Sequence, residues 1–188
     1  MLSQDDQNRW MFDHIPYRVR VAISRLNDLD DSILGVKAFI KEPVPESQEQ
    51  AVYRRCETDA IWEGRLTAIR WLIEFVGVKQ RRKDGKAIRC DVDQKEGSDV
   101  RITHIQGGIF FDLTKEAEAQ RLANIWKGCT QASSHATNAN HLPVDDKTAA
   151  EALKIVLRHL QETIYAGKNL GDYVLTTDPP EKWLGQPR

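Results

Sequence analysis

The chain has 188 residues, a length that fits one domain of ordinary size, and we treat 1–188 as a single domain. Its hydrophobic content of 40%, charged content of 29% and formal net charge of -1 are typical of a soluble globular protein with no global attraction to nucleic acid or anionic lipid. No apolar run reaches the roughly 20 residues that cross a bilayer, so we expect a cytoplasmic protein without a membrane segment.

The first predicted element is a helix over about residues 4–29. Apolar residues recur in it at helical spacing, and Pro16 within the run should kink it or split it in two. The alternation in V-R-V-A-I leaves a strand at 18–23 open as an alternative, but the helical period covers more residues. The apolar positions are Met11, Ile15, Val19, Ala22, Leu26 and Leu29.

A second helix is predicted over about residues 47–76, after the prolines of K-E-P-V-P-E-S. It is apolar around most of its circumference, which predicts a helix nearly surrounded by other elements. Arg65 interrupts the apolar face. A buried guanidinium needs a carboxylate, several carbonyls or a water-filled pocket. We expect an acid on a neighbouring helix, and keep open a pocket in which Arg65, with Arg18 and His135 nearby, binds an anionic ligand.

Residues 79–113 change character and predict a small antiparallel β-insert. The Asp-Gly pair in K-Q-R-R-K-D-G-K-A-I-R is a turn signal between two strand-like pieces. Alternation over 100–105, followed by Gly107-Gly108, predicts a second hairpin. The tip of the first hairpin is basic and could contact nucleic acid, although such a run is more often a solvated turn. Its cations are Arg81, Arg82, Lys83 and Lys86.

Two further helices are predicted over about 115–136 and 147–165, the second capped by Asp145 or Asp146 and closed by Gly167. The tail over 168–188 contains Pro179-Pro180 and is expected to be irregular. The fold class is therefore mainly α: an antiparallel bundle of about four long helices with a small antiparallel β-insert.

Reactive side chains concentrate between the last two helices, in C-T-Q-A-S-S-H-A-T-N-A-N-H-L-P-V-D-D. Ser134 with His135 suggests a nucleophile and a base, although there is no G-x-S-x-G elbow. His141 with Asp145 and Asp146 suggests ligands for a divalent metal, but no recurrent ligand spacing is matched. We therefore expect neither a metal nor a cofactor. Three cysteines without a C-x-x-C pair indicate reduced thiols: Cys56, Cys90 and Cys129.

The segment I-W-K-G-C-T-Q-A-S-S-H-A-T resembles HEPN-type helical domains, in which a small-polar and histidine segment marks a helix end. That resemblance implies a helical bundle and either ribonuclease activity or a non-catalytic interaction role. The signature of the catalytic members is an arginine and a histidine separated by four to six residues. No such arginine precedes His135 or His141, and the formal match Arg9-W-M-F-D-His14 lies in the first helix.

The leading functional prediction is a non-catalytic recognition or regulatory module that self-associates. Its expected partner is a second copy, in a homodimer, or another protein. The first alternative is a HEPN-like ribonuclease in which His135 or His14 transfers a proton and an arginine stabilises phosphate charge. The second is a metal-dependent hydrolase that uses His141 with Asp145 or Asp146.

Overall fold

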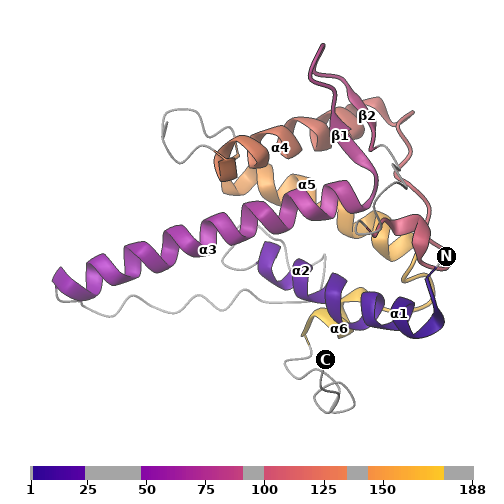
Figure 1. Cartoon of the computed structure of the whole chain (residues 1–188), viewed down its shortest axis with the longest axis horizontal. Coiled ribbons are helices and arrows are strands. Elements are labelled where there is room, and N and C mark those ends of the chain that lie inside the picture. Colours follow the sequence, from indigo (N-terminus) through magenta and orange to yellow (C-terminus); the bar gives the residue numbers. More distant parts are fainter. Residues whose placement is uncertain (1, 24–47, 91–99, 135–143, 176–188) are drawn as a thin grey trace.

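The computed structural model describes residues 2–23, 48–90, 100–134 and 144–175, and only the backbone of 48–60, 132–134 and 174–175 within them. The described chain is mainly helical and carries one two-stranded antiparallel sheet, which confirms the predicted fold class (Figure 1). No helix in the described ranges is long and apolar enough to span a membrane.

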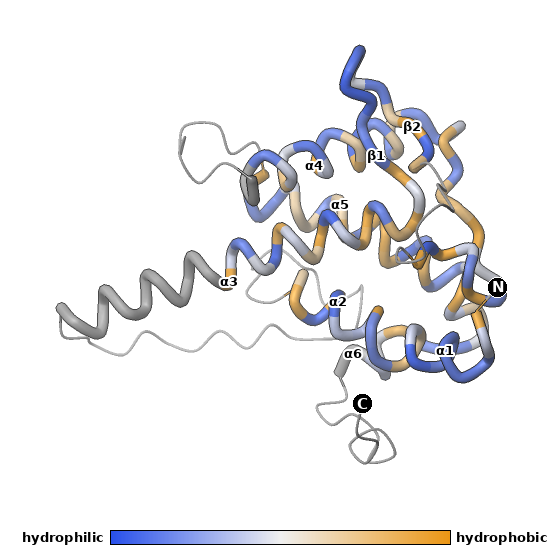
Figure 2. The backbone as a smooth tube through the Cα atoms, viewed as in Figure 1, coloured by the Kyte–Doolittle hydropathy of each residue, from blue (hydrophilic) through white to orange (hydrophobic). Residues whose placement is uncertain are grey.

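Helix α3 (Gln48–Phe75) is the central member of the bundle. It packs against α2 (Ile15–Ile23) on one side and against α4 (Glu116–Ser134) and α5 (Asp146–Glu162) on the other (Figure 1). This explains why its sequence is apolar around most of the helix. Figure 2 shows apolar and polar residues interleaved along α5 and along the coloured part of α3. The buried residues of α3 include Leu66, Ala68, Ile69, Leu72, Ile73 and Phe75.

The predicted first helix is an unbroken series of helical segments with a change of type in the middle. It begins as α1 (Gln4–Arg9), capped by Ser3, continues as a π-helix over Trp10–His14, and returns to α-helical geometry in α2. The alternative strand at 18–23 is therefore wrong. Residues 24–29 of the predicted helix lie outside the described ranges.

Pro16 explains the π-helix, because its ring removes one backbone N–H and crowds the preceding turn. The Ile15 N–H donates to the Trp10 carbonyl, five residues earlier. In that register the next donor, opposite the Met11 carbonyl, would be the N–H that Pro16 lacks. The hydroxyl of Tyr165, which is fully buried, donates to the Met11 carbonyl instead. The C-terminal part of the chain thus completes a backbone bond that the N-terminal helix cannot make.

The first predicted hairpin is present, as β1 (Val78–Gln80) paired with β2 (Ala87–Arg89) in antiparallel register. The second is wrong: Ile102–His104 form a 3-10 helix, followed by a turn in which Gly107 has a φ of +79°. Ile102 and Ile105 are both buried, and residues three apart share a face in a 3-10 turn. A short apolar-polar pattern fits that turn as well as a strand.

The last two helices match the predicted 115–136 and 147–165 within a few residues, and Asp145 caps α5 by accepting from the Thr148 N–H at 2.8 Å. The tail, expected to be irregular from 168, instead forms α6 (Leu170–Leu175). Asn169 opens α6 by accepting from the Gly171 N–H, and Leu170 is buried against the core. Residues 176–188 lie outside the described ranges.

Candidate functional site

The tip of the β1–β2 hairpin is a tight turn that exposes a run of cations. The Arg81 N–H donates to the Lys86 carbonyl at 2.8 Å, and the Gly85 N–H donates to the Arg81 carbonyl at 2.9 Å. Gly85 has a φ of +73°, which only glycine adopts without strain. Asp84 and Gly85 are thus the last two residues of a loop over 82–85, which is longer than the two-residue turn that an Asp-Gly pair predicts. Exposed cations on it are Arg81, Arg82, Lys83 and Lys86.

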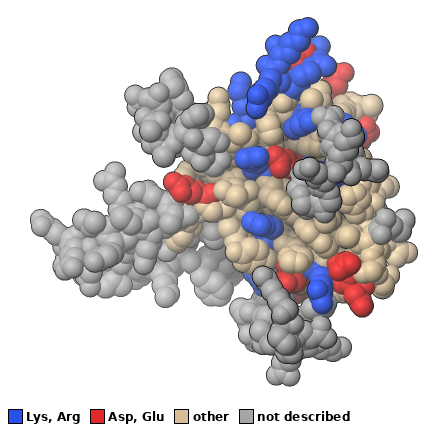
Figure 3. Space-filling model, in the orientation of Figure 1, with Lys and Arg blue, Asp and Glu red and all other residues tan. Residues whose placement is uncertain are grey.

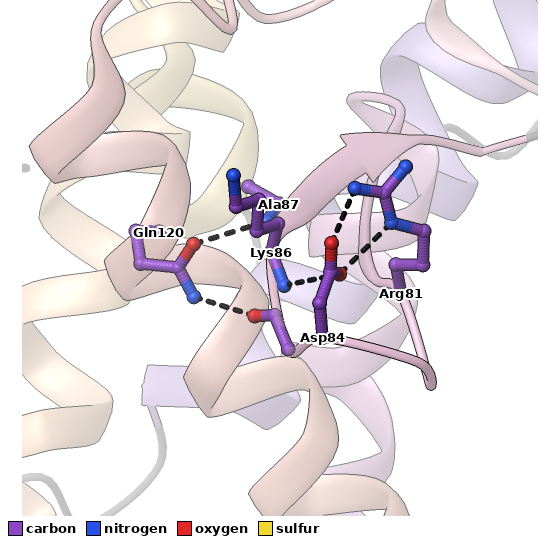
Figure 4. Close-up of polar contacts among 6 residues, drawn as sticks. Arg81, Asp84, Lys86, Ala87 and Gln120 are labelled. Atoms are coloured by element: carbon purple, nitrogen blue, oxygen red, sulfur yellow. Dashed lines mark hydrogen bonds and ion pairs between the residues drawn. The ribbon is translucent and has the colours of Figure 1, made fainter.

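Helix α4 holds this hairpin through side-chain amides (Figure 4). Gln120 accepts from the Ala87 N–H at 3.0 Å and donates to the Gly85 carbonyl at 2.7 Å. One side chain therefore binds the backbone groups before and after Lys86. Gln80 on β1 donates to Asn124 at 2.8 Å, and Gln120 donates to the same amide oxygen. The tip therefore has a fixed position relative to the bundle.

Asp84 lies among the four cations but binds only one of their side chains. The Arg81 guanidinium donates to both carboxylate oxygens of Asp84, Nε to Oδ1 at 2.9 Å and Nη2 to Oδ2 at 2.5 Å (Figure 4). These hydrogen bonds, supported by one from the Lys86 N–H, lower the pKa of Asp84 to about 2. The same pair raises the pKa of Arg81.

The remaining three cations, Arg82, Lys83 and Lys86, have no carboxylate partner among the described residues. Figure 3 shows Lys and Arg side chains gathered over the hairpin at one end of the molecule, and Figure 2 shows the tip as hydrophilic throughout. The whole chain carries a formal net charge of -1, so attraction of an anion needs a local patch of cations such as this one.

Arg65 is held by protein, as expected from an acid on a neighbouring helix. Its Nη2 donates to Asp146 Oδ1 at 2.9 Å, and its guanidinium lies 4.8 Å from the centre of the Trp62 ring. The Arg65 side chain is only 6% exposed, whereas that of Asp146 is 39% exposed. Its Nε has no partner in the described part of the chain. With its charge matched by Asp146, Arg65 is a bundle contact between α3 and α5.

Arg18, the other proposed ligand residue, belongs to an aromatic cluster between the first helix and α3. Its guanidinium lies 5.6 Å from the Trp71 ring, which stacks on Trp10 with centroids 5.6 Å apart and on Phe75 with centroids 5.0 Å apart. The three rings lie nearly parallel, with interplanar angles of 10°, 5° and 14°. The cluster joins two helices.

Most of the remaining predicted site residues have no described side chain. His135 and His141 lie outside the described ranges, and Ser134 is described by its backbone alone. Asp145 is the cap of α5 and Asp146 pairs with Arg65. No group of three potential metal ligands occurs within 2–23, 61–90, 100–131 and 144–173, where side chains are described. The nucleophile and metal hypotheses therefore stay predictions.

His14, from the formal arginine–histidine match, is exposed on the π-helix, with its ring 4.8 Å from that of Trp10. Cys129 is fully buried, and burial raises the pKa of its thiol to about 12, so it is protonated and unreactive at neutral pH. Where side chains are described, the exposed large apolar residues are Tyr17 and Ile109, at 51% and 65%. They lie on separate segments, and self-association stays a prediction.

The basic tip is visible in the sequence, whereas the residues that organise it carry weaker signals. The role of Asp84 had a local signal, since it stands three residues after Arg81 and begins the predicted turn. Gln120 and Asn124 had only the weak signal of two amides four residues apart on an exposed helix face. Their partners lie more than thirty residues away in sequence, a pairing that no spacing rule provides.

No family model, curated protein or solved structure matches this chain. The resemblance to HEPN-type domains and the functions that it implies therefore stay predictions.

Proposed function

We propose that this protein is a recognition module that binds nucleic acid through the phosphate backbone, with the tip of the β1–β2 hairpin as its contact. The observation that carries the proposal is the set of three cations without a carboxylate partner, Arg82, Lys83 and Lys86, on a turn that α4 holds in place. Cations on an ordered turn can meet a row of phosphates without the entropy cost of first ordering the loop.

The composition of the tip favours backbone recognition over recognition of bases. Residues 79–86 contain no aromatic side chain on which a base could stack. They also contain no apolar side chain that could insert into a lipid bilayer, which favours nucleic acid over an anionic membrane. Binding of this kind depends on salt and only weakly on base sequence.

The test is fluorescence anisotropy with labelled mixed-sequence DNA, as a duplex and as a single strand, over a range of salt concentrations. Three phosphate contacts on a duplex predict a slope of log affinity against log salt of about -2.7, or about a 40-fold loss of affinity between about 50 and 200 mM salt. The variant Arg82→Gln/Lys83→Gln/Lys86→Gln should lose this salt-dependent binding.

The matched control removes three cations elsewhere: Lys147→Gln/Lys154→Gln/Lys168→Gln, all exposed on α5 or just after it. The control should bind as the natural protein does, although its net charge equals that of the tip variant. Circular dichroism should show both variants folded. Equal loss in the two variants, or tip-dependent binding to vesicles containing phosphatidylserine with none to nucleic acid, would show the proposal to be wrong.

A further inference from the structure

We propose that Asp84 restrains this site by holding Arg81 away from a ligand's phosphate, so that the unbound hairpin presents three cations although its tip carries four. Asp84 would thereby set the number of phosphates that the tip can neutralise. This restraint rests on the proposed function, because it acts on the same surface.

The geometry supports the restraint because the two groups meet in a fork. Nε and Nη2 of Arg81 donate to different oxygens of Asp84, and these are the same parallel N–H groups that an arginine uses to bind a phosphate. While the carboxylate holds both, a phosphate must displace it to be bound in this way. No comparable carboxylate holds Arg82, Lys83 or Lys86 within the described residues.

Ordinary changes of pH do not release the pair. The hydrogen bonds from Arg81 and Lys86 lower the pKa of Asp84 to about 2, so the carboxylate stays charged under physiological conditions. Both side chains are partly exposed, at 48% and 34%, so a competing anion can reach them. The restraint is removed by substituting the carboxylate.

Asp84→Asn is the appropriate substitution because it removes the charge and keeps the shape. An asparagine can still accept from the Lys86 N–H, a bond of 3.2 Å in the structure, and asparagine is well tolerated before a turn glycine. The hairpin should therefore keep its form. The charge-matched control is Asp5→Asn, an exposed acid in the first turn of α1, at the opposite end of the molecule from the hairpin (Figure 1).

We expect Asp84→Asn to add a fourth phosphate contact, which changes the salt slope on duplex DNA by about one unit, from about -2.7 to about -3.6. Its gain in affinity over the natural protein should shrink about 3-fold to 4-fold between about 50 and 200 mM salt. Asp5→Asn should leave the slope unchanged. The double variant Arg81→Gln/Asp84→Asn should return to three contacts and the natural slope.

A nuclear magnetic resonance titration separates release of Arg81 from simple removal of repulsion. The Nε–H signal of Arg81 should shift on addition of duplex DNA in Asp84→Asn, and should stay in place in the natural protein. An unchanged salt slope or weaker binding in Asp84→Asn, with binding still dependent on the other three cations, would overturn the restraint and leave the proposed function standing. Absence of nucleic-acid binding by the natural protein would instead overturn the proposed function.

Discussion

The hydrogen bond from Tyr165 to the Met11 carbonyl gives the sharpest test of how the N-terminal helix is built. Tyr165→Phe removes one hydroxyl and keeps the packed ring. The Met11 carbonyl would then have no donor, because Ile15 donates to Trp10 and Pro16 has no N–H. Leaving a buried carbonyl without a partner costs about 1–3 kcal/mol, so Tyr165→Phe should lower the free energy of unfolding by that amount.

The assay is urea unfolding followed by circular dichroism near neutral pH. With a slope of about 2 kcal/mol per molar urea, the midpoint should fall by about 0.5–1.5 M, with the slope itself unchanged. Tyr17→Phe is the matched control, because Tyr17 is half-exposed on α2, and its midpoint should move little.

The role of Pro16 is tested by a double-mutant cycle. Pro16→Ala restores a backbone N–H, so the Met11 carbonyl gains a donor within the helix and no longer depends on Tyr165. Tyr165→Phe should therefore cost less in the Pro16→Ala protein than in the natural one, with a coupling of about 1 kcal/mol or more. Equal costs in the two backgrounds would refute the reasoning that links the proline, the π-helix and the tyrosine.

Two other stability effects follow from buried charge. Asp146→Asn leaves the guanidinium of Arg65 buried without its carboxylate and should lower the free energy of unfolding by about 2–3 kcal/mol. Arg65→Met leaves a partly exposed carboxylate and should lower it by less. The reverse order in urea unfolding would contradict this. Burial lowers the pKa of His159 from 6.5, while its Nε2 donates to the Ile109 carbonyl at 2.7 Å. The unfolded chain then binds the proton more readily than the folded chain. Protonation of His159 therefore lowers the free energy of unfolding as pH falls through 6.5 toward the lower pKa of the folded protein. His159→Gln should reduce the loss of urea midpoint between about pH 7 and pH 5, and parallel losses in the two proteins would exclude this role.

The sequence predicted the long helices because each carries a period that repeats over several turns. The inner face of α3 and the stripe of α5 are long enough to outweigh local irregularities. The kind of partner that Arg65 needs was also predictable, because a cation within an apolar face requires a group that matches its charge. Which acid it meets depends on how α3 and α5 cross, and residue spacing does not specify a crossing.

Short elements were predicted less well. The turn at Ile102–His104 was mistaken for a strand, since a few apolar residues fit either geometry. The small helix α6 was missed although Asn169 is a good helix cap, because the prolines further along favoured an irregular tail. At the candidate site the cations were visible in sequence. Whether each was paired depended on turn geometry, and only Arg81 is bound by Asp84.

The bond between Gln120 and the hairpin has a consequence for how molecules of this protein meet one another. A two-stranded sheet leaves unpaired N–H and carbonyl groups along its outer edges, and these can recruit a strand from another chain. Gln120 occupies one donor and one acceptor of that kind, the Ala87 N–H and the Gly85 carbonyl. A side-chain amide thus stands where a third strand would begin to pair, and it hinders edge-to-edge aggregation at this end of the short sheet.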